Sequence, residues 1–132
     1  MIYHFLDIFF VVFHTFLIFF NLFGWMWKRT RKLNLIVLLL TGGSWVILGL
    51  MVGMIGYCPL TDWHFSILTH LGKTNLPDSY IKYLADRLTG LSFDPVFVYQ
   101  VTLYAYLVAL VISLMFNARD YILKKRLGNK ER

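Results

Sequence analysis

The chain has 132 residues, of which 58% are hydrophobic, and a formal net charge of +6. A soluble domain of this length could not bury so much apolar surface, because its surface-to-volume ratio is too high. The basic residues flank apolar blocks, where orientation signals of membrane proteins lie, and one cysteine allows no internal disulfide. We therefore expect an integral membrane protein without a nucleic-acid partner.

The first apolar block covers residues 3–27 and is long enough to cross a bilayer. Trp25 and Trp27 close it as an aromatic belt, and the basic segment 28–32 follows directly. Basic loops are retained on the cytoplasmic side of a membrane. The amino terminus is therefore predicted to lie outside.

The second block covers residues 33–57 and returns outward. It is rich in glycine: Gly49 and Gly53 form a GxxxG pair, while Gly42, Gly49 and Gly56 repeat every seven residues. Small residues allow helix backbones to approach closely in lipid. These four glycines are predicted to form a helix-packing groove, and a homodimer face is the alternative.

Residues 58–94 are predicted to lie outside the membrane, because their acidic and basic residues nearly balance. The apolar spacing indicates two short amphipathic helices, over about 62–71 and 77–90. The first has Leu60, Trp63, Ile67, Leu68 and Leu71 on its apolar face, and the second has Tyr80, Leu84 and Leu88. Both are expected at the outer end of the bundle or in the headgroup layer.

Asp94-Pro95 is typical of a helix start and opens a third block over residues 95–117. A basic tail, residues 118–132, follows and is predicted to be cytoplasmic. The fold class is therefore all-α integral membrane: residues 1–132 form one domain, a three-span helical bundle. Its amino terminus is outside, its carboxyl terminus is inside, and two short amphipathic helices lie on the outer side.

Polar residues follow one stripe in each of two spans. Asp7, His14 and Asn21 are seven residues apart in the first span, and Tyr99, Tyr106 and Ser113 in the third. A rise of about 1.5 Å per residue places these sets at matching depths when both spans run inward. The two stripes are predicted to face and hydrogen-bond each other.

Ionisable groups at membrane depth need a partner or a task. Asp7 and His14 either hold the bundle together or bind a proton, an ion, a metal or the polar end of a lipid. A cluster of His4, Asp7, Cys58 and His64 near the outer surface has suitable metal ligands, although its spacing matches no metal signature. We predict no cofactor.

Two segments resemble a family of small bacterial inner-membrane proteins known only as a domain of unknown function. They are Asp7 with His14 after six intervening residues, and the run Gly56-Tyr57-Cys58-Pro59-Leu60-Thr61. The resemblance covers about residues 3–117, and Asp7, His14, Cys58, Pro59 and Thr61 are the matching positions. It implies a compact multi-pass protein of the bacterial inner membrane. Members of that family carry a Glu-His pair where this chain has Tyr80-Ile81-Lys82-Tyr83.

The leading functional hypothesis is a non-enzymatic accessory or scaffold subunit that contacts the bilayer and a membrane-protein partner or a second copy. One alternative is a redox, metal or proton-handling protein that uses Asp7, His14 and Cys58. A weaker alternative is binding of lipid at the outer leaflet. The candidate functional polar cluster consists of Asp7, His14, Cys58, Thr61, His64, Tyr99 and Tyr106.

Overall fold

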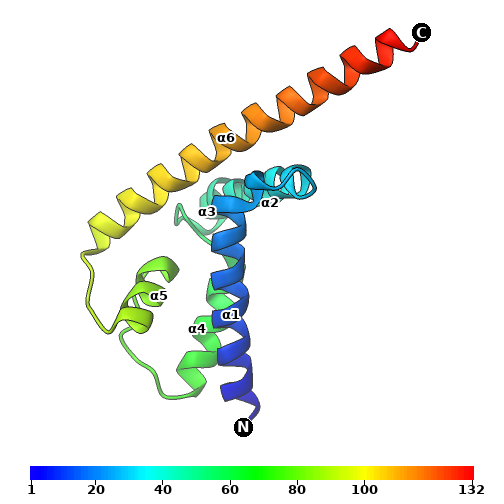
Figure 1. Cartoon of the computed structure of the whole chain (residues 1–132). Coiled ribbons are helices and arrows are strands. Elements are labelled where there is room, and N and C mark those ends of the chain that lie inside the picture. The colour runs from blue at the N-terminus through cyan, green and yellow to red at the C-terminus, as the bar shows by residue number, and fades with distance from the viewer.

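The computed structural model describes residues 1–132 and contains helices without strands (Figure 1). The elements in chain order are α1 (Ile2–Phe23), the 3-10 turn η1 (Gly24–Met26), α2 (Arg31–Gly43), the π-helical turn η2 (Ser44–Leu48), α3 (Gly49–Val52), α4 (Pro59–His70), α5 (Tyr80–Thr89) and α6 (Pro95–Lys130).

Three stretches are long and apolar enough to cross a membrane: Ile2–Met26, Arg31–Val52 and Pro95–Lys130. The all-α membrane fold with three candidate spans is thus confirmed. Two boundaries differ from the prediction. The second span ends at Val52 rather than near residue 57, and the helix of the third continues to Lys130 through the predicted tail.

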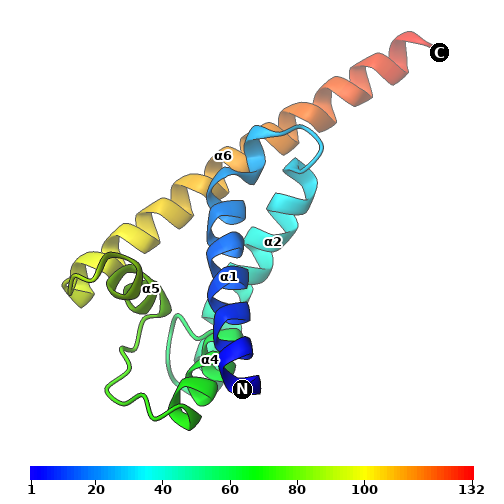
Figure 2. The ribbon, with the colours of Figure 1, turned by 60° about the horizontal axis from the view of Figure 1, so that its bottom comes forward.

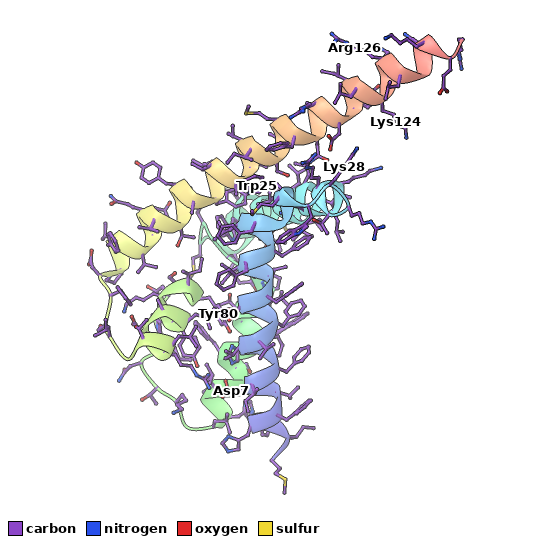
Figure 3. All side chains as sticks on the ribbon, in the orientation of Figure 1. Asp7, Trp25, Lys28, Tyr80, Lys124 and Arg126 are labelled. Carbon is purple, nitrogen blue, oxygen red and sulfur yellow. The ribbon has the colours of Figure 1, made fainter.

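The basic segments lie at one end of the molecule. Figure 3 shows Lys28 near Lys124 and Arg126, far from Asp7. The Arg31 guanidinium forms a salt bridge with Asp120 at 3.0 Å, so the α1–α2 turn is fastened to the start of the basic tail. The basic segments 28–32 and 118–132 therefore lie at the same end of the fold.

The long helices are joined by a buried polar node near the carboxyl end of α1. Asn34 of α2 is fully buried, and its Nδ2 donates to the Phe20 and Asn21 carbonyls at 2.6 and 3.2 Å. From α6, the Ser113 hydroxyl donates to Asn34 Oδ1 at 2.8 Å. One side chain thus connects three helices. Away from this node α6 is steeply inclined to α1 (Figures 1 and 2).

The four glycines of the second block do not share one role. A Cβ on Gly42 would lie 2.2 Å from the Tyr106 hydroxyl, so Gly42 does allow α2 to approach α6. Gly53 and Gly56 instead have φ of 83° and 91° and form a turn beyond α3. The prediction of a shared helix-packing groove is wrong for these two, because both lie past the last helical residue. Gly49 is buried against that turn.

Gly49→Ala is expected to destabilise the chain by about 1–2 kcal/mol. Its Cβ would lie 2.8 Å from the Met54 carbonyl oxygen, which is backbone and cannot rotate away. Gly43→Ala is the matched control, because nothing lies within 4 Å of its Cβ position. SDS-induced unfolding in mixed micelles measures both variants, and equal midpoints would contradict the packing of the turn on Gly49.

Helix α4 packs antiparallel to the amino-terminal half of α1 rather than across the end of the bundle. The Tyr3 and His70 rings are stacked with centroids 5.1 Å apart, and Phe10 stacks on His64 at 5.5 Å. His64 and Leu68 are the fully buried residues of α4, whereas Trp63 is 61% exposed. The predicted apolar face is therefore wrong for Trp63, because α1 contacts the His64–Leu68 side of the helix.

Helix α5 forms within the predicted range. The Ser79 hydroxyl accepts from the Lys82 backbone N–H as an amino-terminal cap, and Gly90 ends the helix in the left-handed conformation. Tyr80 and Leu84 are buried, but Leu88 is exposed. The buried side of α5 therefore begins at Tyr80 and faces α1 and α4.

Candidate functional site

The site is built around the Asp7 carboxylate, which is buried in α1. Arg87 of α5 binds it with two hydrogen bonds, from Nη1 to Oδ1 at 2.7 Å and from Nη2 to Oδ2 at 3.0 Å. His64 of α4 also contacts Oδ1, through Nε2 at 2.8 Å. A two-bond arginine–carboxylate pair is among the stronger polar contacts in proteins. Asp7 therefore ties two helices of the 58–94 segment to the first span.

The His64 ring is fully buried and makes a hydrogen bond on each nitrogen. An ionised carboxylate only accepts, so Nε2 carries the proton that is donated to Asp7. Nδ1 of the neutral ring then accepts from the Tyr80 hydroxyl at 2.6 Å. The three side chains form a continuous hydrogen-bonded chain from α1 through α4 to α5. Figure 3 shows the positions of Asp7 and Tyr80 in this region.

The surroundings shift the pKa values of the groups outside the spans. Burial lowers the pKa of His64 below its ordinary value, and the hydrogen bond with Asp7 acts in the opposite direction. The hydrogen bond with Asp7 raises the pKa of Arg87, and burial raises that of Tyr80. Arg87 therefore stays charged, Tyr80 stays protonated, and His64 is neutral near pH 7.

His14 lies next to this chain but is not hydrogen-bonded into it. Its ring centroid is 3.9 Å from that of Tyr80, and its buried Nδ1 has no hydrogen-bond partner in the protein. Asp7, His14 and Asn21 are the buried residues of α1, so the stripe expected from the sequence is the face on which α1 packs.

The partners of that stripe differ from the prediction. Tyr99 is 55% exposed, and the Tyr106 hydroxyl donates to the Leu38 carbonyl at 2.6 Å. The matching of depths assumed parallel spans, whereas α6 is inclined to α1 and does not extend to the level of Asp7 (Figure 3). The predicted hydrogen bonding between the two stripes is therefore wrong. Asn21 reaches Ser113 only through Asn34.

Two further candidate residues, Cys58 and Thr61, lie outside the Asp7–His64–Tyr80 network. Cys58 is a free, half-buried thiol that precedes α4, and its carbonyl accepts from the Thr61 backbone N–H. No group of three or more His, Cys, Asp or Glu side chains is arranged to hold a metal ion. The hypothetical cluster of His4, Asp7, Cys58 and His64 is therefore not assembled as a ligand set.

Arg87 and Tyr80 were not among the predicted members of the site. A signal for Arg87 was present, because a carboxylate near the end of a span requires a cation. The 58–94 segment has three, and Lys82 has Asp86 one helical turn away as its partner, a pair that the structure forms. Only Lys73 and Arg87 remained as partners for Asp7.

Stability is expected to fall as the pH drops below about 6.5, the ordinary pKa of histidine, in part through His64. The folded-state pKa of His64 is lowered, so the unfolded chain binds more protons in this range. The contribution of His64 to stability is complete above pH 6.5 and is lost as the pH falls through the folded-state pKa of His64. The charged or titratable groups that face His64 are Asp7, His14, Tyr80, Tyr83 and Arg87.

The His64→Gln variant should reduce the dependence of stability on pH. His70→Gln, at an exposed position of the same helix, should leave this dependence unchanged. Unfolding midpoints between pH 5 and 8 test the difference. Identical slopes for the wild type and His64→Gln would show that His64 does not gain a proton on unfolding.

Fold and site together define a small all-α protein with three candidate membrane spans. Its 58–94 segment is bound to the first span by a partly buried ionic network. The chain belongs to the family described as "Protein of Unknown function (DUF2784)", which matches residues 4–118. This confirms the expected membership of an uncharacterised family, while the motifs quoted for it stay predictions. Comparisons with curated proteins and with solved structures give no match.

Proposed function

We propose that this protein is a non-enzymatic accessory or scaffold subunit of a complex in the bacterial inner membrane, and that it works without a cofactor. The observation that supports this is the small mutual burial of its spans. In the most apolar stretch of each span only 11–17% of the residues are buried within the chain. Lipid can cover part of this surface, and a partner helix or a second copy can cover the rest.

The polar groups favour the same proposal over catalysis. The carboxylate at the centre of the site is already engaged, since both oxygens of Asp7 accept from Arg87 or His64 at 2.7–3.0 Å. A carboxylate held by arginine and histidine is a poor general base, because both neighbours favour its charged form. The network instead fixes the position of α4 and α5 on α1, as a scaffold requires.

The proposed orientation has the amino terminus outside and the carboxyl terminus in the cytoplasm. It is supported by the Arg31–Asp120 salt bridge, which brings the α1–α2 turn and the basic tail to one end of the fold. Basic residues near span ends are retained in the cytoplasm. In a Cys58→Ser background, a cysteine at Lys28 should resist an impermeant maleimide on intact cells, whereas one at Asp78 should react.

One observation favours a second candidate, proton handling. The chain from Asp7 through His64 to Tyr80 is continuous, and the neighbouring His14 has an unpaired nitrogen. A proton-handling protein would carry protons into the lumen of liposomes under an imposed gradient. Asp7→Asn would abolish this proton flux. Flux equal to that of empty liposomes would remove this candidate.

Purification in mild detergent followed by native mass spectrometry tests the scaffold proposal. The expected result is a complex of fixed stoichiometry with another membrane protein or a second copy. A photo-crosslinker at Tyr104, which is 66% exposed on α6, should join the same partner. A monomer that carries only lipid, with no cross-linked protein, would contradict the proposal.

A further inference from the structure

A cleft of about 400 Å³ opens beside the Asp7 network. Its lining comes from α1, the turn that follows α4, and α5. The residues are His4, Asp7, Leu71, Lys73, Tyr83 and Arg87. The cleft lies toward the amino-terminal end of α1, remote from the basic segments 28–32 and 118–132 (Figure 3).

Lys73 is held at the cleft by the ordered end of α4. Its backbone N–H donates to the Leu68 carbonyl, and that of Gly72 donates to Thr69, both at 3.0 Å. Gly72 has φ of 79°, so this is the glycine-dependent helix ending that closes with two such bonds. The Lys73 ammonium forms no salt bridge, since the ion pairs of the chain involve other cations. The cleft therefore has in its lining an exposed lysine whose backbone is held and whose ammonium has no counter-charge.

Arg87 and Tyr83 retain unused donors in the same cleft. Arg87 donates both Nη1 protons, one to Asp7 and one to the Tyr83 hydroxyl at 2.6 Å. It donates one Nη2 proton to Asp7. Its second Nη2 proton and its Nε proton have no protein acceptor, and its side chain is 37% exposed. The Tyr83 oxygen accepts from Arg87, so its own proton is free to be donated.

The charges of the lining do not cancel. Asp7 contributes one negative charge, which Arg87 balances, and the positive charge of Lys73 remains. The unused groups of Lys73, Arg87 and Tyr83 are donors, and both oxygens of the Asp7 carboxylate already accept. An anion with several acceptor oxygens is the complement, and arginine with lysine is the pair that proteins use for phosphate.

We propose that this cleft binds a phosphate group through Lys73, Arg87 and Tyr83. A phospholipid headgroup and free phosphate share this chemistry. The amino-terminal end of α1, which also carries the cleft residues His4 and Asp7, has exposed apolar side chains that suit the acyl chains of a lipid: Ile2, Phe5 and Ile8 are 61–68% exposed. This binding site is independent of the scaffold role.

Native mass spectrometry of the full chain with phosphatidylglycerol tests the proposal. Lys73→Gln is the informative variant, because its side chain lies outside the Asp7 network and its loss should not unfold the protein. We expect about tenfold weaker binding of one lipid, as for the loss of a charged hydrogen bond. Lys82→Gln removes the same charge from the same segment but outside the cleft, and should change binding by less than about twofold.

Inorganic phosphate distinguishes the two sources. Stabilisation of the lipid-free protein by phosphate but not by chloride, lost in Lys73→Gln, without binding of phosphatidylglycerol, would assign the site to free phosphate. Phosphatidylglycerol binding that depends on Lys73 assigns it to a headgroup. The proposal is overturned if neither ligand distinguishes Lys73→Gln from the wild type, or if Lys82→Gln lowers binding as much.

Discussion

The Asp7→Asn variant is expected to lose about 2–3 kcal/mol of stability and to release the 58–94 segment from α1. An amide has one acceptor oxygen, so it cannot replace both contacts to Arg87, which are 2.7 and 3.0 Å long. The guanidinium would remain in a partly buried position without its counter-charge. His64 would also lose the carboxylate that accepts from its Nε2.

Hydrogen exchange of the backbone amides of α4 and α5 measures this release, and SDS titration in mixed micelles measures the loss of stability. Asp62→Asn is the matched control, since Asp62 is exposed on α4 and forms no salt bridge. Exchange in α4 and α5 should accelerate in Asp7→Asn alone. Equal protection in the wild type and both variants would mean that other contacts hold the segment.

The Asn34→Leu variant should lower the free energy of unfolding by about 2 kcal/mol, because three hydrogen bonds between helices, of roughly 0.6 kcal/mol each, are lost. Two of them run from Nδ2 to carbonyls at the end of α1, and the third accepts from Ser113 of α6. The leucine would also crowd Gly24, where a Cβ would already lie 2.8 Å from the asparagine Nδ2. The crossing of the three spans should loosen.

A pair of spin labels near the carboxyl end of α1 and the middle of α6 reports this loosening as a broader distance distribution. Asn129→Leu is the control, because Asn129 is exposed near the end of α6. Ser113→Ala removes one bond of the three and should have a smaller effect. An Asn34→Leu protein with wild-type stability and distances would show that apolar packing alone sets the crossing.

The sequence was most informative about the faces of single helices. The seven-residue spacing of Asp7, His14 and Asn21 selects one side of α1, and these are its buried residues. Charge and apolar length likewise predicted three candidate spans. Both features are local: periodicity and hydropathy depend on neighbours along one helix, and the membrane environment preserves them.

The partners of these faces could not be predicted in the same way. Counting depths paired Asp7 with Tyr99 because the spans were treated as parallel. The hypothetical metal cluster did group Asp7 with His64 of α4, but no grouping included Arg87 of α5. In the structure α4 folds back along α1 and supplies His64, while α5 supplies Arg87. The angle of α6 and the path of residues 71–79 result from packing between distant segments, which no periodic pattern encodes.

The glycines show a related limit. Gly49 and Gly53 match a helix-packing spacing, but Gly53 ends α3 in the left-handed conformation. Glycine is favoured both where helices approach closely and where φ is positive, so its spacing alone does not separate these roles. The structure assigns close approach to Gly42 and a turn to Gly53.

The attachment of the 58–94 segment to the first span through Asp7 and Arg87 is tested most directly by a double-mutant cycle of Asp7→Ala and Arg87→Ala. We predict a coupling free energy of at least about 1.5 kcal/mol in mixed micelles, with the double variant little less stable than either single one. Additive effects, within about 0.5 kcal/mol, would contradict a direct ion pair between these two residues.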